Sequence, residues 1–213
     1  MEILSANRKG SWILVSNILS NVASIRQRVA AAAMRADRDP SAVTIVAVSK
    51  TRTVEEIQAV LATGLTHLGE NKVQEMADKY PAIGGSAIWH LIGSLQTNKV
   101  KPAVRMAHLV HSLDRDSRAQ ALAKEAERQG VLCRALVQVN VSGEATKHGV
   151  SPEELPAFLQ RISQAGHIQV EGLMTMAPES SDPETARPHF RRLRELADQI
   201  RQTETPRVSM QHL

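Results

Sequence analysis

The chain has 213 residues, of which 42% are hydrophobic and 23% charged, with a formal net charge of +4 and a pI of about 9.5. This composition is typical of a soluble globular protein. The aromatic content of 2% argues against nucleic-acid binding through stacked bases, and no apolar run is long enough to cross a membrane. The single cysteine, Cys133, excludes an internal disulfide and a cysteine-based zinc site. We therefore expect a cytoplasmic protein whose mildly basic surface suits an anionic small molecule.

The pattern of apolar residues predicts a long first helix followed by alternating strands and helices. Helical spacing indicates a helix over about residues 14–36, which Asp39-Pro40 ends. Next come a strand at 43–49 and a helix at 53–63, then a strand at 66–69 and a helix at 71–80. They are followed by a strand at 88–93 with a short helix that Pro102 begins or interrupts, a strand at 109–113 with a helix at 116–129, and a strand at 131–140 with a helix at 152–165. The last elements are a strand at 168–174, a helix at 183–202 and the beginning of a seventh strand near Val208.

Capping signals mark the ends of several of these helices. Thr53 and Glu56 have the spacing of a capping box, in which each side chain bonds the backbone of the other residue. Ser151 and Glu154 have the same spacing. Gly130 is expected to end the helix at 116–129.

Six successive strand–helix units imply parallel strands joined by right-handed crossovers. Both a doubly wound sheet and a (β/α)8 TIM-type barrel satisfy this order, and the regular spacing with one N-terminal helix favours the barrel. A complete barrel has eight strands in about 250 residues. We therefore expect a single domain, residues 1–213, that forms an incomplete barrel without its last one to two strand–helix units.

Lys50 ends the apolar run 43–49, which reads as a strand buried on both faces. The carboxyl ends of parallel strands carry the chemistry in α/β sheets and barrels. A partly desolvated lysine at such an end has a lowered pKa and offers a neutral amine to a carbonyl, as a Schiff base requires. A lysine that extends from a strand end into solvent is the structural alternative.

The ends of the other strands carry polar residues without a recognisable catalytic or metal-binding spacing. No Ser–His–Asp order, GxGxxG fingerprint or Walker A motif is present. These strand ends contribute Glu70, Asn71, His90, Gly93, Ser112, Asp114, Asn140, Ser142, Met174 and Thr175.

Six ordered segments resemble one protein family. Ala47-Val48-Ser49-Lys50-Thr51 is similar to the cofactor-lysine motif of the pyridoxal phosphate homeostasis protein family, whose members resemble the N-terminal barrel of alanine racemase. The resemblance covers about residues 17–213. The other five segments follow in the family's order: Gly69–Glu75, Trp89–Lys99, His111–Asp114, Gln138–Glu144 with Lys147 and Gly149, and Gly172–Pro178.

This resemblance implies an α/β barrel of the alanine racemase N-terminal-domain type that binds pyridoxal 5'-phosphate as a Schiff base on Lys50. Structural alternatives remain open for the other residues it places near the cofactor: helix caps, a hydrogen-bonded core histidine and a packing methionine. Lys147 is a candidate for transient contact. The further cofactor-binding residues that the resemblance implies are Asn71, His90, Ser112, Asn140 and Met174.

The resemblance also implies a role in intracellular cofactor homeostasis. We expect a monomeric carrier and buffer that supplies cofactor-dependent client enzymes, with no catalytic residue, no metal and no turnover. Two alternatives are an amino-acid racemase, for which Tyr80 is the sole tyrosine, and a cofactor-free Schiff-base aldolase with Glu70 as the acid. The family pattern continues beyond Leu213 with a phosphate-binding loop and a last strand, so we expect the chain to lack the principal phosphate site.

Overall fold

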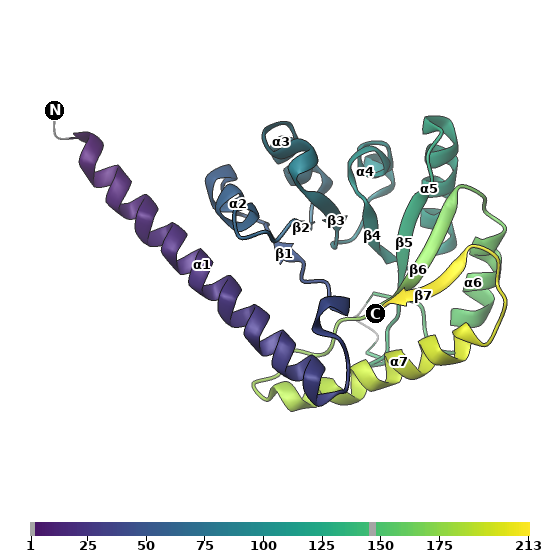
Figure 1. Cartoon of the computed structure of the whole chain (residues 1–213). Coiled ribbons are helices and arrows are strands. Elements are labelled where there is room, and N and C mark those ends of the chain that lie inside the picture. The colour runs from purple at the N-terminus through teal and green to yellow at the C-terminus, as the bar shows by residue number, and fades with distance from the viewer. Residues whose placement is uncertain (1–2, 145–147) are drawn as a thin grey trace. The chain divides into compact units, whose positions relative to one another are not determined.

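The computed structural model describes residues 3–144 and 148–213, so Lys147 lies outside the described residues. The chain forms two compact units whose segments interleave in the sequence. The first unit holds the residues up to 70 and residues 75–89, and the second holds 71–74 and 90–213. Figure 1 follows the alternation of strand and helix along the chain.

In the described part of the chain, seven strands form one sheet in the order β1-β2-β3-β4-β5-β6-β7, which is also their order in the sequence. The pairs β1/β2, β3/β4, β4/β5, β5/β6 and β6/β7 are all parallel. This is the strand order of a (β/α)8 barrel with seven of its eight strands, and it confirms the predicted fold class. The strands are β1 Ala47–Val48, β2 His67–Glu70, β3 Ile88–Leu91, β4 Leu109–Leu113, β5 Cys133–Gln138, β6 Ile168–Met174 and β7 Val208–His212.

Helices alternate with these strands as predicted, although several boundaries differ. The first helix begins at Ile3 instead of about residue 14, and Pro102 lies inside the first turn of the fourth. The seventh begins at Arg187, after a 3-10 turn at Pro183–Ala186. The helices are α1 Ile3–Arg35, α2 Val54–Leu61, α3 Val73–Ile83, α4 Val100–Met106, α5 Asp116–Gln129, α6 Leu155–Ser163 and α7 Arg187–Arg201.

The predicted capping box of α2 is present, whereas Ser151 does not cap α6, whose N-cap is Glu154 without a side-chain bond. The Thr53 hydroxyl accepts a hydrogen bond from the Glu56 amide at 3.3 Å, and the Glu56 carboxylate accepts one from the Thr53 amide at 2.7 Å. The Ser151 hydroxyl accepts from the Glu154 amide at 3.2 Å. Here the prediction of a helix from residue 152 is wrong, because residues 152–154 form a turn and α6 begins at Leu155.

The prediction that residues 43–49 form a strand buried on both faces is wrong. Only Ala47 and Val48 are in β1, and Val48 is 48% exposed. β1 is the first strand in the sheet order, so it pairs with β2 and is an edge strand of the described sheet. An edge strand without a second neighbour needs neither a long ladder nor two buried faces.

The core of the second unit lies between β4–β7 and the helices α5, α6 and α7, which pack against these strands. Gly130 ends α5 in the left-handed conformation with φ of 67°, as the sequence predicted. Side chains of this core that are at most 3% exposed include Val110, Leu113, Leu122, Val137, Phe158, Ile162, Val170, Leu173 and Leu193.

Candidate functional site

Lys50 lies two residues after the end of β1, in the first unit, and is exposed. Within the described part of the chain, no carboxylate or other acceptor binds its amine. The Arg52 amide bonds the Ser49 carbonyl at 3.0 Å and closes a turn around Lys50. Thr51 in this turn has φ of 61°, a left-handed conformation that is unusual for a β-branched residue. The chain therefore presents a free amine on a tight, strained turn.

A buried ionic cluster in the same unit surrounds the backbone on both sides of Lys50. The Lys79 ammonium donates to the Ser49 carbonyl at 2.6 Å, to Glu70 Oε1 at 2.7 Å and to Glu75 Oε1 at 2.8 Å. Glu75 Oε1 also accepts the Thr51 amide at 2.5 Å. The Ser49 hydroxyl donates to Glu70 Oε1 at 2.8 Å. Ser49 and Thr51 are thus both held by side chains of this cluster.

The cluster is buried, so the charges of its side chains interact strongly and shift the pKa of Lys79. Glu70 is fully buried and Lys79 is 8% exposed. Burial opposes the charged form of Lys79, but the hydrogen bonds and charges of Glu70 and Glu75 outweigh it and raise the pKa of the ammonium group above its ordinary value. The second carboxylate oxygen of Glu70, Oε2, is buried and has no hydrogen-bond donor among the described residues.

The sequence analysis missed Lys79, although one signal for it is present. Glu75 and Lys79 are four residues apart on α3, the spacing of a helical ion pair. Such pairs are common on exposed helix faces and contribute little there. Only the contacts with Ser49 and Glu70, which come from other elements, distinguish this lysine from a solvated one.

In the second unit, Gly93 brings the segments of Asn71 and Ser112 together. A Cβ at Gly93 would lie 2.2 Å from the Asn71 carbonyl oxygen, so only glycine permits this approach. The buried Ser112 hydroxyl donates to the Gly93 carbonyl at 2.7 Å. Asn71 and Gly93 also line a cavity of about 470 Å³ with Lys72 and Lys99.

His90, the third residue of β3, is buried and forms a pair with His111 of β4. His90 Nδ1 and His111 Nε2 are 2.8 Å apart, and the two rings meet edge to face at 5.0 Å. Burial lowers the pKa of His111 to about 4, and the charge of His212 adds to the shift. A neutral His111 ring is therefore part of this site at neutral pH.

Arg118 of α5 fixes the strand ends around Ser112. Burial alone would raise the pKa of Asp114, but Arg115 and Arg118 lower it below its ordinary value. The sequence analysis placed Asp114 at a strand end and missed Arg118. The Arg118 guanidinium donates to Leu95 O at 2.9 Å, Ser112 O at 2.7 Å, Asp114 Oδ1 at 2.5 Å and Ser94 Oγ at 3.1 Å.

Asn140 and Met174 follow or end the neighbouring strands β5 and β6. Met174 pairs with Gln138 in the ladder, and its carbonyl accepts the Val139 amide at 2.8 Å. Asn140 organises the loop that follows: its amide side chain donates to the Glu144 carbonyl at 2.9 Å and accepts the Gly143 amide at 3.2 Å. Both residues are half-buried.

The five residues predicted near the cofactor in the second unit therefore fall into three groups. Asn71 and Ser112 are linked through Gly93, His90 pairs with His111, and Asn140 and Met174 belong to adjacent strand ends. Lys50 belongs to the first unit. Their roles toward a ligand stay predictions.

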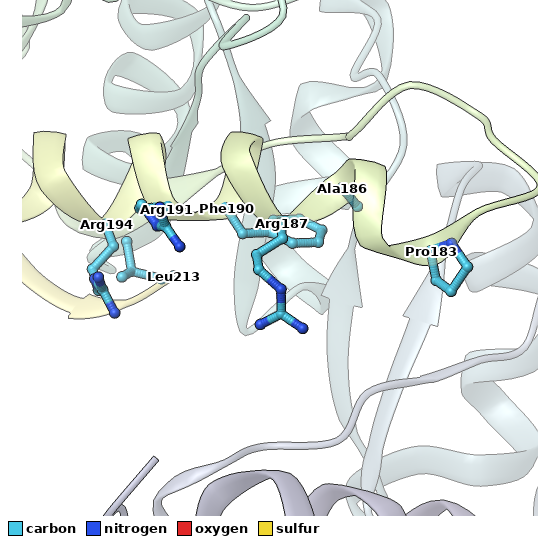
Figure 2. A pocket seen from close by; sticks show the side chains of 7 residues that line it. All are labelled: Pro183, Ala186, Arg187, Phe190, Arg191, Arg194 and Leu213. Atoms are coloured by element: carbon cyan, nitrogen blue, oxygen red, sulfur yellow. The ribbon is translucent and has the colours of Figure 1, made fainter. Parts of the chain in front are cut away.

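A second cavity, of about 480 Å³, lies along α7 and the 3-10 turn before it (Figure 2). Arg187, Arg191 and Arg194 extend from the helix beside Phe190 and Leu213, which makes the cavity basic and partly apolar. Arg187 forms an ion pair with Glu184 at 2.7 Å. None of the predicted cofactor-binding residues lines it.

The described residues contain no group of three or more His, Cys, Asp or Glu side chains that could hold a metal ion. Among the helices described, none is long and apolar enough to cross a membrane. Cys133 is buried, and burial raises the pKa of its thiol to about 12. It packs in β5, and a thiol with its pKa raised in this way holds little of the reactive thiolate at neutral pH.

Comparison with known proteins relates residues 17–213 to the family model of the alanine racemase N-terminal domain. The chain is 38% identical over 198 residues to the pyridoxal phosphate homeostasis protein of Aquifex aeolicus, covering 92% of this chain and 86% of that protein. It is 37% identical over 183 residues to the protein of the same name from Pseudomonas aeruginosa, covering 85% and 80% of the two chains.

Solved structures show the same relationship. PipY of Synechococcus elongatus with pyridoxal phosphate bound superimposes with a TM-score of 0.76 at 29% identity, covering 91% of this chain and 85% of that one. Alanine racemase from Corynebacterium glutamicum superimposes with a TM-score of 0.63 at 17% identity, covering 89% of this chain and 52% of that one, which shows the shared fold.

Proposed function

Because the chain belongs to the pyridoxal phosphate homeostasis protein family, we propose that it binds pyridoxal 5'-phosphate through Lys50 and acts as a carrier and buffer of this cofactor. The observation that supports the proposal most directly is the accessibility of the Lys50 amine. Its amine is exposed and unpaired among the described residues, and it stands on a turn that the buried cluster holds in a strained conformation.

The exposed Lys50 amine suits the aldehyde of such a cofactor. When bound, the cofactor supplies an aldehyde that condenses with a lysine amine, releasing one water and requiring no oxidant or reductant. Lys50 would hold the cofactor covalently. Lys79 does not compete with it, because all three ammonium hydrogens of Lys79 are already donated to Ser49, Glu70 and Glu75.

In the second unit, we propose that Asn71, His90 and Ser112 contribute to the polar surroundings of the cofactor. Ser112 acts through the Gly93 carbonyl that it already binds. His90 would contribute from the ring pair that it forms with His111, whose facing nitrogens are 2.8 Å apart. Met174 would pack against the cofactor ring, and Asn140 would shape the loop beside it.

Two contacts argue against turnover. A racemase needs a second base, but the Tyr80 ring packs against the buried Trp89 ring with centroids 6.3 Å apart. An aldolase needs a mobile acid, but Glu70 is fully buried and binds both Lys79 and Ser49. The supply of cofactor to client enzymes, a monomeric state and a cytoplasmic location are parts of the same proposal.

The experiment that tests the proposal is covalent trapping. The purified chain is incubated with pyridoxal 5'-phosphate, reduced with borohydride and mapped by peptide mass spectrometry, with Lys50→Ala as the control. We expect the label on the Lys50 peptide. Predominant labelling of Lys72, Lys99 or Lys147 would contradict the role of Lys50. Lysine-dependent exchange of the α-proton of L-alanine in heavy water, over many turnovers, would contradict a carrier and favour a racemase.

A further inference from the structure

Lys79 and Glu75 bind the backbone on both sides of Lys50. Covalent binding of a cofactor by Lys50 does not by itself require these hydrogen bonds. We propose that Lys79, held between Glu70 and Glu75, is a positioning residue that fixes the Ser49–Thr51 backbone so that Lys50 presents its amine in one direction. This inference rests on the proposed role of Lys50, but it concerns residues that do not themselves touch the cofactor.

The geometry of the cluster requires an ammonium group at residue 79. An ammonium has three donors, and each of them is used, within 2.8 Å, by Ser49 O, Glu70 Oε1 and Glu75 Oε1. The planar fork of an arginine cannot direct three bonds around one nitrogen in this way. The carbonyl before Lys50 is therefore bound by a cation that is itself held by two carboxylates.

The cluster also holds the residue after Lys50. Glu75 Oε1 accepts the Thr51 amide at 2.5 Å while it binds Lys79. Thr51 has φ of 61°, a conformation that a β-branched residue keeps only where its surroundings impose it. The strain thus lies next to the reactive lysine, and the cluster supplies the contacts that maintain it.

Stability alone does not explain this arrangement. Two apolar side chains of similar volume in place of a buried ion pair often leave a protein as stable as before, or more stable. Here a fully buried carboxylate keeps one oxygen, Glu70 Oε2, without a donor among the described residues. What apolar residues would not provide is the set of directed bonds to Ser49 and Thr51 on either side of Lys50.

The test separates positioning from folding with two sets of variants. The first is Glu70→Met combined with Lys79→Met, which removes the buried charges together so that neither is left unpaired. The second compares Glu75→Leu, which removes the acceptor of the Thr51 amide, with Glu75→Gln, which keeps an oxygen there. Lys124→Met, the same loss of a lysine at an exposed position of α5, is the matched control.

Four quantities are measured for each variant: the melting temperature, the amide hydrogen exchange of Thr51 without cofactor, the rate of borohydride-trapped capture of pyridoxal 5'-phosphate, and the rate of reductive methylation of Lys50 by formaldehyde. Formaldehyde is small and needs no defined approach, so its rate reports the reactivity of the amine alone. Capture of the larger aldehyde requires orientation, and loss of orientation costs about tenfold or more in rate.

We expect the double variant and Glu75→Leu to exchange the Thr51 amide at least about tenfold faster. We also expect them to capture the cofactor about tenfold more slowly at an unchanged methylation rate. Glu75→Gln, which keeps an acceptor for the Thr51 amide but loses the charge beside Lys79, should recover most of the loss seen in Glu75→Leu. Lys124→Met should behave like the parent chain. Folded variants with unchanged exchange and capture would overturn the inference, and so would capture and methylation that fall together. If the parent chain captures no cofactor at Lys50, the proposed function fails, and the Thr51 exchange still decides whether the cluster fixes this turn.

Discussion

Gly93 shows how a residue without a side chain determines the position of two others. Its Cα approaches the Asn71 backbone so closely that a Cβ would lie 2.2 Å from the Asn71 carbonyl oxygen. Its own carbonyl accepts the Ser112 hydroxyl at 2.7 Å. Because a methyl group at this point would collide with backbone atoms instead of a flexible side chain, the neighbouring segments would have to move apart.

We therefore predict that Gly93→Ala lowers the free energy of unfolding by about 1–3 kcal/mol and weakens cofactor retention. Gly85→Ala is the matched control, because a Cβ there meets nothing within 4 Å. Urea denaturation of the two variants checks the prediction. Equal stability of Gly93→Ala and Gly85→Ala would contradict the close packing at Asn71.

Residues at strand ends are predictable from the sequence, whereas their partners are not. Lys50, Asn71 and Ser112 follow or end apolar runs, and that pattern alone assigns them to the ends of strands. Lys79 is separated from its partner Ser49 by 30 residues and reads as an ordinary helical lysine. A contact of this kind depends on how β1, β2 and α3 pack, which local spacing does not encode.

At the scale of elements, one side chain of α5 holds the loop after β3 and the end of β4. Arg118 is 4% exposed, and it bonds two backbone carbonyls as well as the buried carboxylate of Asp114. Removing it would leave that carboxylate without its buried counter-charge and the carbonyls of Leu95 and Ser112 without this donor. Arg115 would still bond both Asp114 oxygens, but its side chain is exposed. Losing the buried partner of an ion pair costs more than losing an exposed one.

We predict that Arg118→Met destabilises the protein by about 3–5 kcal/mol. Arg128→Met on the same helix, which removes an ion pair of an exposed arginine with Glu125, should cost far less. Chemical denaturation at pH 7 measures both. If both variants lost a similar amount of unfolding free energy, water would replace the hydrogen bonds of Arg118 without a free-energy cost, which would contradict the prediction.

Elements with strong local signals matched their predictions, and those that depend on neighbours did not. The strands β4 and β6 and the helix α5 have the predicted bounds, because apolar runs, an acidic first turn and Gly130 define them locally. β1 is reduced to two residues, since the length of an edge strand depends on pairing. The start of α6 shifted because a polar turn at 152–154 precedes the helix.

On the scale of the whole molecule, the alternation of strand and helix was readable from the sequence, but the division into two units was not. The chain passes from one unit to the other at three points: between Glu70 and Asn71, between Gln74 and Glu75, and between Trp89 and His90 inside β3. No change of composition marks any of these points. That residues 1–213 act as a single domain therefore stays a prediction.

The pH dependence of global stability should reflect the half-buried His111, which pairs with His90. Unfolded His111 binds a proton below about pH 6.5, whereas the folded residue has its pKa lowered to about 4 by burial and by His212. Its contribution is complete above pH 6.5 and is lost as the pH falls toward 4, because the unfolded state then binds more protons.

We predict that, relative to His111→Gln, the parent chain loses up to about 3 kcal/mol of unfolding free energy between pH 7 and pH 4. Denaturation curves of both proteins at several pH values give this difference, in which the titration of groups that do not interact with residue 111 cancels. Parallel pH profiles would contradict the burial of a neutral His111.

Because the Cys133 thiol is buried, its rate of alkylation can report how often the interior of the second unit opens to solvent. Alkylation requires both access and a thiolate, and the native thiol has neither, with its pKa raised to about 12. Modification by iodoacetamide should therefore proceed only through openings that expose β5, at a rate set by their population. A cofactor that binds only the closed form should slow alkylation by the factor 1 + [L]/Kd, where [L] is the free cofactor concentration and Kd its dissociation constant. The alkylation half-life of Cys133 would then report the affinity for the cofactor.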